Sequence, residues 1–104
     1  MKKSVNGKSF DEIFAQRGEK VESAEMVKGV IYFCPKRDGF WGSIFEIAPK
    51  NYRTFSNGVI QCVNILVENE VLSDYCLHET SGAEHYEATK DQIDLLNAYK
   101  NDQP

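Results

Sequence analysis

Apolar and β-branched residues are densest between residues 59 and 77, where the chain reads VIQCVNILVENEVLSDYCL. In the first part of this segment, Val59–Glu68, both alternating sets of positions are mainly apolar. A strand with two apolar faces is usually covered on both, so the pattern predicts a strand that sits centrally in a sheet. Asn69 and Glu70 suit a tight turn, after which Val71–Leu77 returns as a second strand. The segment therefore predicts a β-hairpin.

Strict alternation divides the first strand of this hairpin into two apolar faces. One face would carry Val59, Val63, Ile65 and Val67, and the other Ile60, Cys62 and Leu66. Counted outward from a two-residue turn, Cys62 would lie opposite Leu77, and Cys76 would lie opposite Val63. The two cysteines would then point to opposite faces, so a disulfide between them would need a β-bulge that shifts the register.

Two capping boxes mark the expected helices. Ser9 and Glu12 have the spacing at which a hydroxyl accepts from the N3 amide while the N3 side chain reaches back to the cap. Thr89 and Gln92 repeat this spacing near the C-terminus. Apolar side chains follow both caps at helical spacing: Phe10, Ile13 and Phe14 after the first, and Ile93, Leu95, Leu96 and Tyr99 after the second. Gly18 is suited to end the first helix.

The complete pattern predicts an α+β fold. The expected elements, in chain order, are a helix over residues 9–17, strands over 28–34, 40–48, 59–68 and 71–77, and a helix over 89–100. Residues 19–27 could form a loop or a weak edge strand, a short strand at 52–55 is left open, and 78–86 has the pattern of a loop. Because strands and helices do not alternate, we expect an antiparallel β-sheet of four to five strands, with a short N-terminal helix and a C-terminal helix packed on it.

Length and composition are those of a single domain spanning residues 1–104. A hydrophobic content of 41%, with 12% aromatic residues, is enough for a core. No apolar run is long enough to cross a membrane, and the N-terminal lysines are not followed by the apolar stretch of a secretory signal. The three cysteines, Cys34, Cys62 and Cys76, all lie in predicted strands. We therefore expect buried free thiols in a reducing, cytoplasmic environment.

Charge is distributed unevenly along the chain. Residues 1–58 carry a net charge of +3 and residues 59–104 carry −7, against −4 for the whole chain. So acidic a surface repels nucleic-acid phosphates and attracts basic proteins. It could also be only a solvated face that keeps the protein soluble. Tyr75, Tyr86 and Tyr99 lie among the acidic residues, and tyrosine is a frequent anchor at protein interfaces.

No enzyme motif is present in the sequence, which has no Gly-rich phosphate loop, no G-x-S-x-G and no H-E-x-x-H. Cys76 and His78 are two apart on one predicted strand face, and Glu84 and His85 follow in the next loop. These are metal-ligating residue types, but their spacing matches no known zinc motif, so we expect no metal site. The same thiol and imidazole could be neighbours in cysteine catalysis. The basic and aromatic loop at 36–41 is too small to indicate nucleic-acid binding in an acidic chain.

Small size, acidity, a single α+β domain and the absence of catalytic motifs are similar to the properties of small bacterial immunity proteins and phage-encoded inhibitors. This resemblance of class properties implies a non-enzymatic protein without a cofactor. Its partner would be a basic enzyme, such as a nuclease toxin, whose active site it blocks. The expected contact residues are Asp74, Glu79, Glu84, Tyr86, Glu87, Asp91 and Asp94. In this prediction Asp91 and Asp94 share one side of the C-terminal helix, and Tyr86 is the apolar anchor between the acids.

A second interpretation belongs to another functional class. A small enzyme or ligand-binding domain could have a pocket between sheet and helix, formed around Cys76 and His78 or around Trp41.

Overall fold

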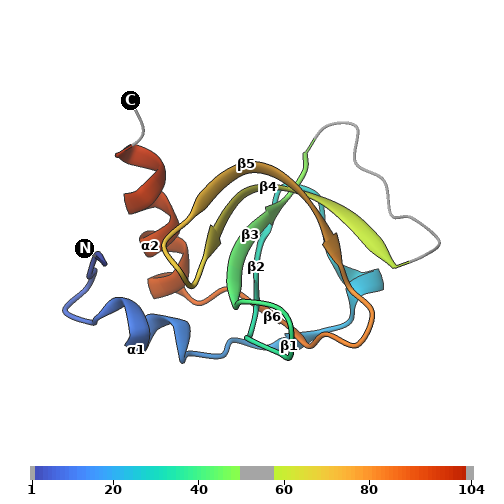
Figure 1. Ribbon diagram of the computed structural model, residues 1–104, viewed down its shortest axis with the longest axis horizontal. Coiled ribbons are helices and arrows are strands. Elements are labelled where there is room, and N and C mark those ends of the chain that lie inside the picture. The colour runs from blue at the N-terminus through green and yellow to red at the C-terminus, as the bar shows by residue number, and fades with distance from the viewer. Residues whose placement is uncertain (1, 50–57, 103–104) are drawn as a thin grey trace.

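The computed structural model describes residues 2–49 and 58–102, which form one antiparallel sheet with two helices on one of its faces (Figure 1). The elements are α1 (Phe10–Phe14), β1 (Lys20–Val21), the 3-10 helix η1 (Ser23–Glu25), β2 (Ile31–Cys34), β3 (Ser43–Ile47), β4 (Val59–Val67), β5 (Leu72–Glu79), β6 (His85–Glu87) and α2 (Lys90–Asn101). The strand order is β1-β6-β2-β3-β4-β5. The predicted α+β class and the hairpin β4–β5 are confirmed, although β4 lies next to the edge strand β5 rather than at the centre. The possible strand at 52–55 lies outside the described residues.

The sheet has six strands, not the four to five that were predicted. The difference arises at 78–86, where a loop was expected: β5 continues to Glu79, and β6 follows. β6 pairs with strands on both sides, placing Tyr86 opposite Phe33 of β2 and opposite Lys20 of β1. A three-residue strand leaves no periodic pattern in a sequence, because its pairing partners come from distant segments. The weak edge strand considered for 19–27 is present as β1.

Both capping boxes form as predicted. Ser9 Oγ accepts from the Glu12 amide at 3.1 Å, and Glu12 Oε1 accepts from the Ser9 amide at 3.0 Å. Thr89 and Gln92 make the same two bonds at 3.1 and 3.0 Å. The last residue of α1 is Phe14, so the helix is shorter than the predicted range. The caps thus fix where both helices begin.

Gly18 does not end α1 as predicted, because the C-cap of that helix is Ala15. A Cβ atom at position 18 would lie 2.1 Å from the carbonyl oxygen of Glu87 on β6. No side chain can occupy that space, so glycine is required here for the close approach of two backbone segments.

One hydrophobic core lies between the helices and the sheet. It contains Phe10, Ile13 and Phe14 of α1, Phe33, Ile44 and Leu66 of the sheet, and Leu95, Leu96 and Tyr99 of α2. Ile93 is only half-buried, whereas Gln92 is completely buried. The amide nitrogen of Gln92 donates to the carbonyls of Ile13 and Gln16 at 3.1 and 3.0 Å. The buried side chain of Gln92 therefore links α2 to α1 and to the residues that directly follow α1.

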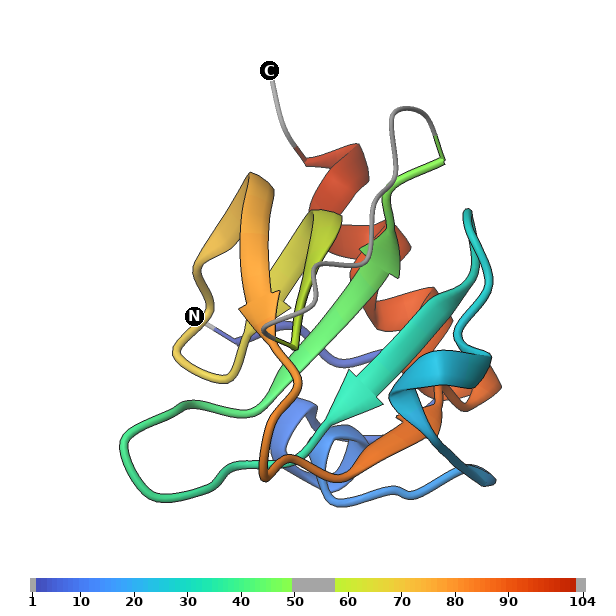
Figure 2. The same cartoon turned by 90° about the vertical axis from the view of Figure 1, so that its right-hand side faces the viewer.

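A second core lies on the opposite face of the sheet. Its members are Met26, Tyr32, Cys34, Phe45, Ile47, Ile60, Cys62 and Ile65. Strands β4 and β5 arch over this side (Figure 1), and η1 lies in front of β2 (Figure 2). The sheet is therefore packed on both faces, with both α-helices on the same side.

The alternation of faces along β4 changes at Asn64. This residue has a φ of 51°, and the pairing with β3 slips by one residue beside it. Before this β-bulge, Ile60 and Cys62 belong to the second core; after it, Ile65 belongs to the same core and Leu66 lies under the helices. The predicted strict alternation is therefore wrong beyond Asn64, because the extra residue exchanges the two faces.

The turn between β4 and β5 has three residues, 68–70, instead of two. Glu70 has a φ of 70°, and its amide donates to the carbonyl of Val67 at 2.9 Å. The additional residue moves the register by one, so Cys62 lies directly opposite Cys76. The predicted register is wrong for this reason, and both cysteines are free thiols.

Truncation of adjacent β4 residues tests the two cores separately. Ile65→Ala and Leu66→Ala should each lower the free energy of unfolding by about 2–5 kcal/mol, since each removes a buried aliphatic side chain. Val71→Ala is the control, because Val71 is half exposed, and should change stability by less than about 0.5 kcal/mol. Urea denaturation measures all three. Parental stability of either core variant would contradict burial on both faces of β4.

Candidate functional site

Two acids of the predicted contact set, Asp91 and Asp94, face the N-terminal segment of the chain. Asn6 Nδ2 donates to both carboxylates, at 2.8 and 2.9 Å. Gln16 donates to Asp91 at 2.8 Å, and Lys8 forms an ion pair with it at 3.2 Å. These contacts lower the pKa of Asp91 to about 2, and the hydrogen bond from Gln16 has the largest effect. The two helix acids therefore have partners within the fold.

Other acids near the start of α2 are paired as well. Asp94 lies 2.6 Å from Lys90 in an ion pair one turn apart on the helix. Glu84 lies 3.8 Å from Lys20 on β1 and accepts from the Tyr86 hydroxyl at 2.8 Å. Tyr86 itself is half-buried and packs against the core under the helices. This part of the predicted surface is thus largely neutralised by contacts inside the molecule.

The remaining predicted contact residues lie in two different parts of the sheet. Glu87 is exposed on β6, whereas Asp74 and Glu79 are exposed on β5, at the other end of the strand order. On β5 they flank Tyr75 and Leu77, each of which is 54% exposed. Acidic and apolar side chains therefore occur together on the edge strand rather than at the start of α2.

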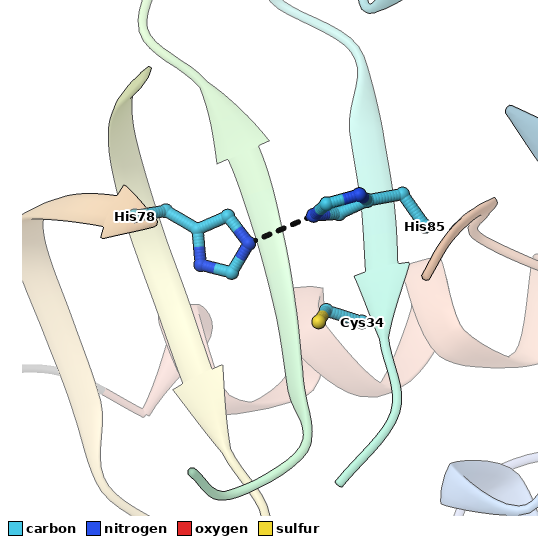
Figure 3. A group of neighbouring side chains, drawn as sticks. All are labelled: Cys34, His78 and His85. Carbon is cyan, nitrogen blue, oxygen red and sulfur yellow. Dashed lines mark hydrogen bonds between the residues drawn. The ribbon is translucent and has the colours of Figure 1, made fainter. Parts of the chain in front are cut away.

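A cluster of one thiol and two imidazoles, Cys34, His78 and His85, lies on the face of the sheet opposite the helices (Figure 3). These residues come from β2, β5 and β6. One ligand-type atom of each lies within 4.8 Å of the others, and the two histidine Nε2 atoms are 2.9 Å apart. Cys34 and His85 are buried, with 3% and 2% of their surface exposed. In Figure 3 the two rings point toward each other, and the Cys34 sulfur lies below the line that joins them.

Both histidines of this cluster are neutral at neutral pH. Burial is the main cause that lowers the pKa of each to about 4; the positive charge of Arg37 contributes to both shifts, and His85 contributes to that of His78. The centroid of the Phe45 ring lies 4.7 Å from that of His78 and 6.3 Å from that of His85. A neutral imidazole keeps one ring nitrogen available as an acceptor or metal ligand. The two Nε2 atoms form a hydrogen bond, so one of them carries its ring proton, and that proton would have to move to Nδ1 for both Nε2 atoms to bind a metal.

The connection between the two histidines is held by hydrogen bonds to Arg37 and to Gly58. The Arg37 guanidinium donates to the carbonyls of Ser81 and Glu79 at 2.8 and 3.0 Å. The Thr80 hydroxyl and amide both donate to the carbonyl of Gly58, each at 2.7 Å. These bonds fix the path of the chain from β5 to β6, and they therefore fix the positions of both imidazoles.

A pocket of about 370 Å³ opens beside the cluster. Cys34 and His78 line it on the inside, and Cys76, Phe40 and Trp41 line it toward solvent. Phe40 and Trp41 are about half exposed, at 50% and 54%. This pocket lies on the sheet face away from the helices, whereas the second interpretation of the sequence placed one between sheet and helix. The volume and the aromatic rim of this pocket lie within the range of small-molecule binding sites.

The three thiols differ in accessibility. Cys34 and Cys62 are buried, but Cys76 is exposed because it lies on the edge strand. The expectation of three buried thiols is therefore wrong for Cys76. Burial raises the pKa of each thiol, and that of Cys62 reaches about 12.

Sequence spacing directed attention to Cys76 as the cysteine nearest to His78 and His85. The structure instead brings Cys34 to the two imidazoles, because β2 pairs directly with β6. Glu84, the fourth residue considered, forms an ion pair with Lys20. No local spacing connects residue 34 with residues 78 and 85, so the cluster becomes visible only with the strand order.

No protein-family model matches this chain, and no curated protein sequence or solved structure is significantly similar to it. Within residues 2–49 and 58–102, no helix is both long enough and apolar enough to cross a membrane.

Thiol labelling should separate Cys76 from the other two cysteines. In the native protein Cys76 should react with a maleimide or disulfide reagent at least about tenfold faster than Cys34 and Cys62, since thiolate fraction and access set the rate. Mass spectrometry of peptides after timed quenching measures each site. Cys76→Ser should remove only the fast phase. Equal rates at all three sites would contradict the exposure of β5.

Replacement of Asp91 tests its role within the fold. Asp91→Asn should lower the urea midpoint at pH 7, because it removes the charge that pairs with Lys8. The folded pKa of about 2 lies below the ordinary 3.8, so this stabilisation is present above pH 3.8 and is lost as the pH falls from 3.8 toward 2. The difference between the two proteins should therefore shrink at pH 3.

The control for this experiment is Asp38→Asn, which removes an exposed loop charge and should leave the midpoint unchanged at both pH values. A midpoint for Asp91→Asn equal to that of the parent at pH 7 would show that these contacts contribute nothing to stability.

Proposed function

We propose that this chain is a non-enzymatic acidic module that binds a basic protein through the edge strand β5. The partner class that best fits is a basic enzyme, such as a nuclease toxin, and the module would act as its immunity or inhibitor protein. The observation that supports this function most directly is the surface formed by Asp74, Tyr75, Leu77 and Glu79, which we call the β5 edge surface.

The first support is the position of β5 at the end of the strand order. Among the described residues no further strand pairs with its outer edge. The outer peptide groups of such a strand are available to another chain, and several classes of binding protein add a strand in this way. An edge eight residues long, Leu72–Glu79, offers enough backbone for that mode of binding.

The second support is the side-chain chemistry of the β5 edge surface. Tyr75 and Leu77 are more than half exposed, although tyrosine and leucine gain most from burial. In the described part of the chain, neither Asp74 nor Glu79 has an ion-pair partner. An apolar centre with an acidic rim is complementary to a hydrophobic contact surrounded by lysine and arginine.

The third support is the charge of the whole C-terminal half, which is −7 over residues 59–104. Asp91 and Asp94 contribute to this field although their carboxylates have partners within the fold. Long-range attraction depends on net charge, and it accelerates association with a basic cleft that normally binds phosphates. Direct contact would then be made by the β5 edge surface, and the substrate would be excluded from the cleft.

Charge reversal on β5 tests this function. Asp74→Lys/Glu79→Lys should leave the fold intact, because both side chains are exposed. Association with the partner should slow by at least about tenfold at low ionic strength, and the loss should shrink as salt rises. The partner would be captured from extract of the source cells on the immobilised chain, purified, and assayed for nuclease activity with and without the chain.

The matched control is Glu19→Lys/Asp38→Lys, which makes the same change in net charge at exposed positions outside the β5 edge surface. It should slow association less than the β5 variant. A captured protein that is acidic, or whose activity persists in the complex, would refute the inhibitor function. Equal effects of the two double variants would refute the β5 edge surface as its contact site.

A further inference from the structure

We propose that Cys34, His78 and His85 form a binding site for one transition-metal ion. The chemistry of these ligands points to Zn²⁺. This inference goes beyond the proposed protein-binding function and does not depend on it. The site lies on the opposite side of β5 from Tyr75 and Leu77, since successive side chains of a strand alternate between its two faces.

The ligand set determines the class of metal. One thiolate and two imidazoles are borderline-soft ligands that suit Zn²⁺ and exclude Ca²⁺ and Mg²⁺, which prefer oxygen. Three protein ligands leave one position of a tetrahedral ion open. Among the described residues this is the one group of three such side chains whose ligand atoms converge.

The distances require only small side-chain movements. With Zn–N bonds of about 2.0–2.1 Å, two imidazole nitrogens on a tetrahedral ion lie about 3.3 Å apart. The Nε2 atoms of His78 and His85 are 2.9 Å apart, so the rings need to separate by a few tenths of an ångström. The longest separation in the cluster is within 4.8 Å, against about 3.5 Å for sulfur and nitrogen on one ion. Rotation of the Cys34 side chain about its Cα–Cβ bond would have to supply this change.

The site is also held in place before any ion arrives. His78 and His85 are only seven positions apart, and the hydrogen bonds of Arg37 and Thr80 fix the connection between them. Cys34 is fixed by the pairing of β2 with both β3 and β6. A preorganised set of ligands loses little conformational freedom on binding, which favours affinity.

Arg37 determines what the open position accepts. Zn²⁺ with one thiolate leaves a net charge of +1, and coordination releases the Cys34 thiol proton to solvent. The Arg37 guanidinium lines the same pocket as Cys34 and His78, so a second positive charge lies near the ion. An anionic fourth ligand, hydroxide or a carboxylate from the pocket side, balances this charge better than a neutral one does.

Cobalt titration tests the site directly. The purified full chain, stripped of metal by a chelator, should bind one equivalent of Co²⁺ with a thiolate-to-cobalt charge-transfer band, and Zn²⁺ should displace it. Cys34→Ser should abolish the band. Cys76→Ser is the matched control, since Cys76 lines the same pocket, and it should keep the band. His85→Gln should weaken affinity by more than the about 10–100-fold that loss of an outer-shell partner costs.

A second measurement uses the parent protein and so does not depend on the folding of a variant. Zn²⁺ should protect Cys34 from alkylation and leave Cys76 reactive, as determined by mass spectrometry. Zn²⁺ should also raise the urea midpoint, because it binds only the folded arrangement. Absence of stoichiometric Co²⁺ binding would overturn the proposal. A band that survives in Cys34→Ser and disappears in Cys76→Ser would also overturn it, by moving the ion to the other thiol.

Discussion

The exchange of faces at Asn64 is the constraint on which the rest of the molecule depends. If side chains alternated strictly along β4, all of its even-numbered residues would face the same core. With the bulge, Ile60 and Cys62 face one core while Leu66 faces the other. The same change occurs on β5, where Leu72 packs near the helices and His78 contacts Phe45 on the opposite face. The β4–β5 hairpin can therefore pack against the helices on one face and carry His78 of the histidine cluster on the other.

Strand β5 has two different roles on its two sides. One side carries Cys76 and His78, which line the pocket, and the other carries Tyr75 and Leu77, each 54% exposed; Leu77 also reaches the pocket rim. Arg37 holds the end of the strand by donating to the carbonyl of Glu79 at 3.0 Å. His78 of the proposed metal site and the β5 edge surface thus lie on one strand, although each proposal has its own test.

Local patterns predicted the parts of this fold that depend on neighbours in sequence. Capping boxes at Ser9 and Thr89 identified both helices, and the β4–β5 hairpin followed from its apolar runs. The register could not be predicted, because the three-residue turn requires a positive φ at Glu70. Glycine or asparagine would indicate such a turn in a sequence, but glutamate does not. Strand β6 was missed for a related reason: its formation depends on partners more than 50 positions away in the chain.

The candidate sites were predictable only in part. Residues Asp74 and Glu79 were among the expected contacts, and the structure leaves them exposed. Asp91 is instead tied to the N-terminal segment, which no local pattern could indicate because the two lie at opposite ends of the chain. The meeting of Cys34 with the histidines depends on strand order, and strand order depends on the collapse of the whole chain around both cores.

The exposed edge of β5 also determines how copies of this protein behave toward one another. Two such edges could pair antiparallel around a twofold axis, which would extend one sheet into the next. Residues directly opposite each other in such a pair share one face of the sheet, so an axis at Leu77 would place Tyr75 of one molecule opposite Glu79 of the other. Asp74 and Glu79 have no ion-pair partner in the described part of the chain, so the seam between the two copies would gather four unpaired carboxylates. Charge on an edge strand opposes such pairing, and natural edge strands use charge in this way against aggregation. The acidic residues that make β5 attractive to a basic partner thus also oppose its pairing with a second copy of itself.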